Sequence, residues 1–154
     1  MFSWFKKESY LLNKTIRDNI VAAIVKAERF TSAEIRIYVE SHCAKTSALS
    51  RAEHLFEKLN MHQTIERNGI LIYLALKDKK FAIAGDVGIH QKIEKADAYW
   101  QQRVQELIPF LKENKIEEGL IDCIEKLGQC LQQHFPAQRD NHLNELPNEI
   151  VFGK

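Results

Sequence analysis

Residues Ile70–Ala84, ILIYLALKDKKFAIA, decide the fold of this 154-residue chain. The uninterrupted apolar run Ile70–Leu76 is typical of a central strand that is covered on both faces. The charged turn Lys77–Lys80 is short enough to join this strand to the next one, Phe81–Ala84, as a hairpin. We therefore predict that these two strands lie side by side and antiparallel.

The region before this hairpin supplies the first strand and two helices. The segment Glu34–Glu40, EIRIYVE, alternates apolar and polar residues, which is the pattern of a strand with one buried face. Apolar residues recur three to five positions apart between about residues 10 and 30, as in an amphipathic helix. A second helix begins after Thr46 and connects the first strand to the central one. Because it is a crossover connection, these two strands are predicted to be parallel.

Two further helices follow the hairpin. The first starts at Asp97 and repeats apolar residues at helical spacing, and Pro109 should kink it or end it. The second covers Glu117–Phe135. From Pro136 onward the composition turns polar, so residues 136–154 are predicted to be a loosely held extension without regular structure. Its apolar residues are candidates for docking onto the domain: Leu146, Ile150, Val151 and Phe152.

These elements predict an α/β fold, a three-layer α/β/α sandwich in which helices flank a small mixed β-sheet. Residues 1–135 would form a single domain, with the N-terminal helix at about residues 10–30 and the core at residues 31–135. The chain length and a hydrophobic content of 45% are sufficient for one core of this size.

The composition argues against several classes of function. Lys and Arg total 22 against 21 Asp and Glu, so a net charge of +1 provides no electrostatic footprint for nucleic acid. No apolar run has the length of a signal peptide core or a membrane span. The three cysteines are an odd number without C-x-x-C spacing, which argues against disulfides and structural zinc. We expect a cytoplasmic protein with no nucleic acid partner.

Acidic residues that are far apart in the sequence should meet at one edge of this sheet. Glu34 begins the first strand, Arg67 precedes the parallel second strand, and Asp86 ends the antiparallel third strand, all at the same edge. Asp97 begins the next helix within reach of this edge. Carboxylates are preferred ligands of Ca²⁺ and Mg²⁺. We predict a divalent cation, Ca²⁺ first and Mg²⁺ second, at Asp86, Asp97 and Glu34. Either the cation or Arg67 would compensate the repulsion between the carboxylates.

Each of these residues also has a structural interpretation that the sequence leaves open. Asp86 and Asp97 are both suited to cap the N-terminus of a helix, and capping does not exclude metal binding. Glu34 could be an ordinary solvated strand residue. Arg67 could be a surface charge, an ion-pair partner of Asp86 or a phosphate anchor.

The sequence contains no recognised pattern for catalysis. The six histidines form no H-x-x-x-H or H-E-x-x-H pattern, and there is no G-x-S-x-G, Walker or G-x-G-x-x-G motif. His42 and Cys43 are adjacent, but neighbours along a strand point to opposite faces, so they do not form a catalytic pair. The sequence therefore indicates no clear nucleophile or general acid.

Three segments together resemble the TPM domain family, named for thylakoid lumen, photosystem II repair and acetylcholine-receptor modulator proteins. They are AEIRIYVES at residues 33–41, RNGILIYLALKDKKFAIAGDVGI at residues 67–89 and EEGLIDCIEKLGQCL at residues 117–131. The resemblance runs from about Thr31 to Phe135. The tail DNHLNELPNEIVFG is similar to the ending of short, soluble bacterial members without a membrane anchor. Many anchored relatives have G-x-G-L-E after the third strand, where this chain has Gly85–His90, GDVGIH.

The resemblance implies an α/β/α sandwich, a divalent-cation site that is reported as calcium in some members, and the acid phosphatase activity proposed for a plant member. Asp86 carries over best, followed by Asp97, whereas Glu34 rests on the predicted topology. The first hypothesis is therefore a regulatory or interaction domain that binds a divalent cation. The second is a metal-dependent phosphatase for phosphomonoesters, with Arg67 binding phosphate. The third is a metal-independent protein-interaction module.

Overall fold

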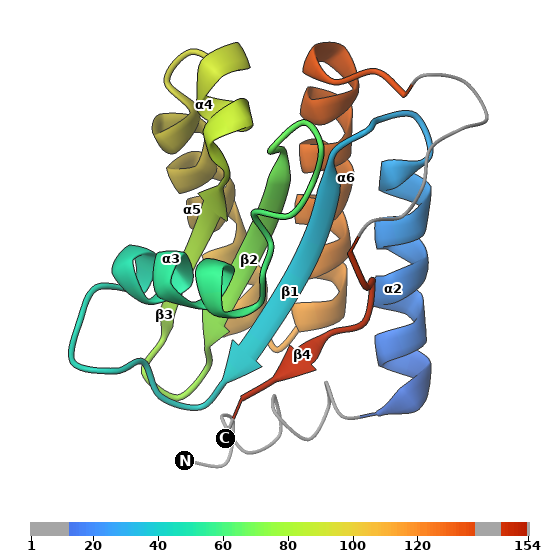
Figure 1. The fold of residues 1–154 in the computed structure, drawn as a ribbon. Coiled ribbons are helices and arrows are strands. Elements are labelled where there is room, and N and C mark those ends of the chain that lie inside the picture. The colour runs from blue at the N-terminus through green and yellow to red at the C-terminus, as the bar shows by residue number, and fades with distance from the viewer. Residues whose placement is uncertain (1–12, 138–145, 154) are drawn as a thin grey trace.

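The computed structural model describes residues 13–137 and 146–153, and its four strands form one mixed sheet (Figure 1). The strands are β1 (Glu34–Glu40), β2 (Gly69–Ala75), β3 (Lys80–Gly85) and β4 (Val151–Phe152), in the spatial order β3-β2-β1-β4. The parallel pairing of β1 with β2 and the antiparallel pairing of β2 with β3 confirm both predictions.

Helices cover both faces of the sheet, which confirms the predicted three-layer sandwich. On one face lies α3 (Ala48–Lys58), which crosses the strands (Figure 1). The other face is covered by α2 (Lys14–Glu28), α5 (Ala96–Lys112) and α6 (Ile116–His134). A short helix, α4 (Val87–Lys92), directly follows β3. The first residues of the predicted N-terminal helix, 10–12, lie outside the described residues.

Alternate residues of the strands belong to two separate hydrophobic cores, one on each face of the sheet. Ile35, Ile37 and Val39 of β1 belong to the larger core with α2, α5 and α6. Tyr73 of β2 lies in the smaller core under α3. Every residue of β2 is buried, because helices cover this central strand on both faces. The continuous apolar run in the sequence is thus explained, as predicted, by burial of this strand on both faces.

The end of the chain is more ordered than the sequence suggests. Residues Val151–Phe152 pair in parallel with β1, and Leu146 is buried in the smaller core. A Cβ atom on Gly153 would lie 2.3 Å from the Tyr38 hydroxyl oxygen, so any larger residue would require the Tyr38 side chain to move. The prediction that no regular structure follows Pro136 is therefore wrong for residues 151–152. A two-residue strand has no periodicity by which the sequence could reveal it.

Pro109 lies inside α5 and does not end it, because the helix continues to Lys112. Within the described parts of the chain, no helix combines the length and the apolar character that a membrane crossing requires.

Candidate functional site

The edge of the sheet at which β1 and β2 begin contains the residues predicted to form the acidic corner. Glu34 lies opposite Gly69 in the parallel register, and the Asp86 backbone N–H donates to the Gly69 carbonyl oxygen at 3.0 Å. The strands that carry the two acids therefore meet at one edge, as predicted. Six of the seven buried polar residues in the described ranges lie before β1 or β2, at the first residue of β1, or just after β3: Glu28, Thr31, Glu34, Thr64, Asn68 and Asp86.

Asp86 is held by an arginine and by the helix that it caps. Its Oδ2 accepts from Arg67 Nε at 2.8 Å, and its Oδ1 accepts from Arg67 Nη2 at 3.0 Å and from the Val87 N–H at 2.7 Å. Asp86 is buried, whereas 47% of the Arg67 side chain is exposed. The hydrogen bond with Asp86 raises the pKa of Arg67. Both structural interpretations of Asp86, the helix cap and the ion pair, describe its environment.

Glu34 is fully buried, so it is not a solvated strand residue. Its Oε1 accepts from the Leu146 backbone N–H at 2.8 Å, which ties the C-terminal segment to β1. Next to it, Glu28 is also buried, and its Oε2 accepts from the Ile35 N–H at 2.8 Å. Burial raises the pKa of Glu28 to about 8, and the nearby charge of Glu34 acts in the same direction, against the hydrogen bond from Ile35. Glu28 could not be recognised from the sequence, because a glutamate at the end of an amphipathic helix resembles a surface residue.

Asp97 lies apart from this network. Its side chain is 74% exposed and its Oδ1 is 3.8 Å from Nε2 of His90. The N-cap of α5 is Lys95, with a left-handed backbone (φ 56°) and no side-chain cap bond. Asp97 therefore belongs to the first turn of the helix, where a negative charge is favourable, and its interpretation as the cap is wrong.

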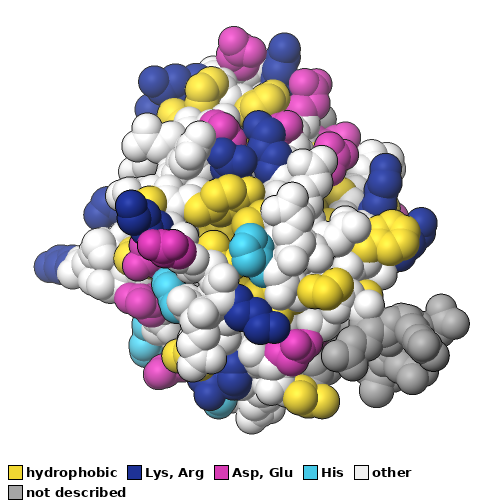
Figure 2. Space-filling view, turned by 90° about the horizontal axis from the view of Figure 1, so that it is seen from above, with side chains coloured by type: hydrophobic (Ala, Val, Ile, Leu, Met, Phe, Trp, Pro, Cys, Tyr) yellow, Lys and Arg dark blue, Asp and Glu magenta, His cyan; other side chains and the backbone are white. Residues whose placement is uncertain are grey.

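The predicted carboxylates do not fit a preformed cation site. Within residues 13–137 and 146–153, no group of three or more His, Cys, Asp or Glu side chains is placed to hold a metal ion. Arg67 engages both oxygens of Asp86, Glu34 is buried and accepts from the Leu146 backbone N–H, and Asp97 is exposed. Figure 2 views the molecule from the side of this edge, and acidic and basic side chains are interspersed on the surface there. The contact of Arg67 with Asp86 is the ion pair that the sequence allowed as one of the two compensations.

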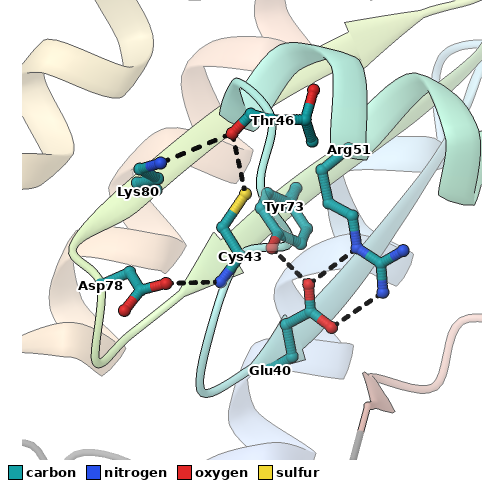
Figure 3. Close-up of polar contacts among 7 residues, drawn as sticks. All are labelled: Glu40, Cys43, Thr46, Arg51, Tyr73, Asp78 and Lys80. Atoms are coloured by element: carbon teal, nitrogen blue, oxygen red, sulfur yellow. Dashed lines mark hydrogen bonds and ion pairs between the residues drawn. The ribbon is translucent and has the colours of Figure 1, made fainter.

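The opposite edge holds a polar cluster that was not predicted from the sequence (Figure 3). Glu40, the last residue of β1, accepts from Arg51 Nε at 2.9 Å and from Arg51 Nη2 at 3.0 Å. The Tyr73 hydroxyl donates to the same carboxylate. Burial acts to raise the pKa of Glu40, but the hydrogen bonds from Arg51 and Tyr73 and the charge of Arg51 outweigh it, so the pKa lies below its ordinary value. Burial, followed by the bond to Glu40, raises the pKa of Tyr73.

The loop after β1 is fastened to the β2–β3 turn beside this cluster (Figure 3). Asp78 accepts from the Cys43 backbone N–H at 2.8 Å, and its other oxygen lies 3.0 Å from His42 Nδ1. The Cys43 thiol donates to the Thr46 carbonyl oxygen at 3.7 Å. The hydrogen bond with His42 lowers the pKa of Asp78, followed by the bond from Cys43. These contacts order the loop and give neither residue the geometry of a nucleophile with its base.

The Glu40 cluster is suited to holding α3 on the sheet rather than to proton transfer. Three donor groups occupy the carboxylate, and its lowered pKa makes it a poor base. Arg51 is 11 residues from Glu40 and Tyr73 is 33 residues from it, so no short sequence pattern could have identified the group.

Among residues 13–137 and 146–153, no strand pairs with the outer edge of β3. The bond from Asp86 to Gly69 sets the alternation of the antiparallel ladder, so the N–H and C=O groups of Phe81, Ile83 and Gly85 point away from β2. Two hollows of about 310 and 300 Å³ lie along this edge, and Phe81 lines both. We call them together the β3 groove. The first is also lined by Leu49 of α3 and by Asp97, Trp100, Gln101 and Val104 of α5, and the second by Leu76, Lys79, Ile108, Leu111, Lys112 and Asn114.

Comparison with known protein families matches residues 6–130 to the TPM domain. The chain belongs to the TPM domain family. The NMR structure of the BA42 protein from the psychrophilic bacterium Bizionia argentinensis is similar to this TPM domain, with 37% sequence identity and a TM-score of 0.81. The similarity covers 92% of this chain and 94% of that chain, a larger share than the family match.

A more distant structure shows the same fold. The N-terminal domain of cg2496 from Corynebacterium glutamicum has 14% identity and a TM-score of 0.60, over 77% of this chain and 73% of that chain. A comparison with curated proteins found no match. Membership of the family thus establishes the fold of this TPM domain, and its function has to be argued from its own residues.

Proposed function

We propose that this TPM domain acts by binding another polypeptide along the β3 groove rather than by catalysing a reaction. The observation that supports this function is the free edge of β3 with two hollows beside it. An extended segment could add to the sheet through the outward backbone groups of Phe81, Ile83 and Gly85. Its alternate side chains would enter the hollows, which are lined mainly by apolar residues.

The ion pairs at the two ends of the sheet favour peptide binding over phosphate chemistry. Arg67 is paired with Asp86, and Arg51 is paired with Glu40, each through two nitrogens. Neither arginine is therefore free to anchor a phosphate without first breaking an ion pair. The carboxylates are likewise occupied, so the phosphatase alternative has less support from these contacts.

The proposal is tested by titrating the protein with selected peptides and by substituting a surface residue that lines the groove. Peptides of about ten residues selected against the full chain from a random library would be titrated into isotope-labelled protein. We expect shifts and slower exchange at the amides of Phe81, Ile83 and Gly85. The substitution Gln101→Trp should fill the first hollow and weaken binding, whereas Gln102→Trp, at the next exposed position of α5, should not. Failure to select any binder, or shifts confined to another face, would contradict the proposal.

A divalent cation at Asp86, Asp97 and Glu34 is a second proposed function. It is supported by the meeting of Glu34 and Asp86 at one edge of the sheet, since carboxylate oxygens are the ligands that these cations prefer. Binding would require Arg67 to leave Asp86. Calorimetric titration with Ca²⁺ and with Mg²⁺ tests this proposal. Heat that disappears in Asp86→Ala supports it, and absence of heat in the unmodified protein overturns it.

A further inference from the structure

We propose that the polypeptide bound in the β3 groove carries an apolar side chain and, two residues further along, an acidic side chain that reaches Lys79 and Lys112. This inference rests on the proposed function, because it assumes that an extended segment occupies the groove. It adds the chemical character and the direction of that segment.

The spacing follows from the position of Phe81. Because this residue lines both hollows, they lie next to each other along β3. Side chains two residues apart on a strand point to the same face, at a separation of roughly 6.5 Å. Two such side chains of an added strand can therefore enter the two hollows, one on either side of Phe81.

The hollows differ in charge. Leu76, Ile108 and Leu111 give the second hollow apolar walls, and Lys79 and Lys112 add two positive charges. Among the described residues, neither lysine has an ion-pair partner in the structure. A glutamate would pack its methylene groups on the apolar walls and place its carboxylate at the lysines.

The acidic residues that adjoin these lysines in the sequence have other polar partners. Glu113 lies 3.6 Å from the Lys115 ammonium group, and Asp78 pairs with His42. The C-terminal end of α5 contributes a partial negative charge near Lys112, but its effect is smaller than that of two full charges. At the far end of the groove, the exposed Asp97 would repel an acidic side chain. The segment should therefore bind in one direction, with its apolar residue near Trp100 and its acidic residue near Lys112.

A second copy of this chain fits the groove less well than a single extended segment. Besides β3, the first hollow is lined by side chains of α3 and α5, which lie on opposite faces of the sheet. If two β3 edges paired, α3 and α5 of one copy would clash with the same helices of the other copy. Exposed Lys80 at the start of β3 also disfavours such pairing, as lysines on edge strands commonly do.

The inference can be tested with two labelled peptides of eight residues that differ at one position. In both peptides Val and Thr alternate, and the residue that would enter the first hollow is Leu. The residue that would enter the second hollow, two positions further along, is Glu in one peptide and Lys in the other. Fluorescence anisotropy with the full chain should show about fivefold tighter binding of the Glu peptide at low salt. The difference should shrink in about 1 M salt, where charges are strongly screened.

Charge reversal in the protein provides the matched control. The double variant Lys79→Glu, Lys112→Glu should bind the Lys peptide better than the Glu peptide, whereas Lys26→Glu, Lys58→Glu, at exposed positions outside the groove, should keep the original preference. Equal binding of both peptides to the unmodified protein would overturn this inference and leave the proposed function standing. Binding of neither peptide, nor of any selected from the library, would overturn both. A dimer abolished by Gln101→Trp would overturn the inference in favour of a second copy in the groove.

Discussion

Two buried glutamates near opposite ends of β1 differ in charge state, although the protein covers them almost equally. Glu28 contacts the start of the strand and is 4% exposed, and Glu40 ends the strand and is 5% exposed. The pKa of Glu28 is raised to about 8, whereas that of Glu40 is lowered. Burial is the largest single cause for both groups and acts to raise both values, but at Glu40 the hydrogen bonds from Arg51 and Tyr73 and the charge of Arg51 together outweigh it.

The partners explain this difference in simple terms. Glu40 has a guanidinium group and a phenol beside it, which stabilise its charged form. Glu28 has one backbone N–H and the like charge of Glu34. Glu40 is therefore a carboxylate with a cationic partner, whereas Glu28 is held by a backbone N–H and stays protonated to a higher pH. Four substitutions test this comparison.

The largest effect is expected from Arg51→Met, which removes the cation from Glu40. A buried carboxylate without its partner should lower the free energy of unfolding by about 3 kcal/mol. Urea denaturation at pH 7 measures this loss. The double variant Glu40→Gln, Arg51→Met should recover part of the stability, because no charge is then left unpaired. A loss below about 1 kcal/mol in the single variant would contradict the assignment of a compensated ion pair.

Glu28→Gln, in contrast, is expected to increase the free energy of unfolding. Because the folded pKa of Glu28 is about 8 and its ordinary value is 4.5, its contribution to stability is fully present below pH 4.5 and is lost as the pH rises through 8. Glutamine cannot ionise and can still accept from the Ile35 N–H. The variant should gain on the order of 2 kcal/mol at pH 8 relative to the unmodified protein, and little at pH 4.

Denaturation curves between pH 4 and pH 9 check this difference. Glu125→Gln on α6, an exposed glutamate outside the network, is a suitable control. The same pH slope in Glu28→Gln and in the unmodified protein would show that Glu28 is not the group that titrates.

A smaller loss is expected from Asp86→Ala, which removes the cap of α4 and the partner of Arg67. The free energy of unfolding should fall by about 1 kcal/mol, the usual cost of a lost helix cap. Asp86→Asn keeps a capping oxygen and should cost less. If Asn and Ala cost the same, the ion pair with Arg67 rather than the cap would account for the stabilisation.

The smallest effect on stability is expected from Asp97→Ala. This side chain is exposed and lies outside the buried network, so stability should change by less than about 0.5 kcal/mol. The variant therefore tests the role of Asp97 in cation binding without a large change in the free energy of unfolding. If calorimetry detects Ca²⁺ binding, Asp97→Ala should weaken it without changing the denaturation midpoint, and a larger loss of stability would mean that Asp97 has a structural role.

Much of the fold could be predicted because it depends on local patterns. The apolar run before the charged turn predicted the hairpin of β2 and β3, and the intervening helix predicted the parallel pairing of β1 and β2. The Asp86 cap was among the predicted alternatives, since capping depends on the next few residues. β4 escaped prediction because its pairing with β1 spans more than 100 residues.

The candidate site was harder to predict, because its residues were identified by position on an edge rather than by the direction of their side chains. The edge shared by Glu34 and Asp86 was correct, but the contacts of the two carboxylates differ: one binds the backbone of Leu146 and the other binds Arg67. The uncompensated partner of Glu34, Glu28, could not be recognised from its position in a helix.

The sequence by itself determined the order of the elements and the pairing of three strands, because hydrophobic periodicity and short connections act between neighbours in the chain. Only the tertiary structure decided which carboxylates are compensated and which edge of the sheet stays open. Those properties depend on contacts between residues such as Glu40 and Arg51 or Glu28 and Glu34, whose distances are set by the packing of whole helices on the sheet. Coulombic and desolvation energies depend on these distances and on burial, and neither quantity is encoded in a local pattern.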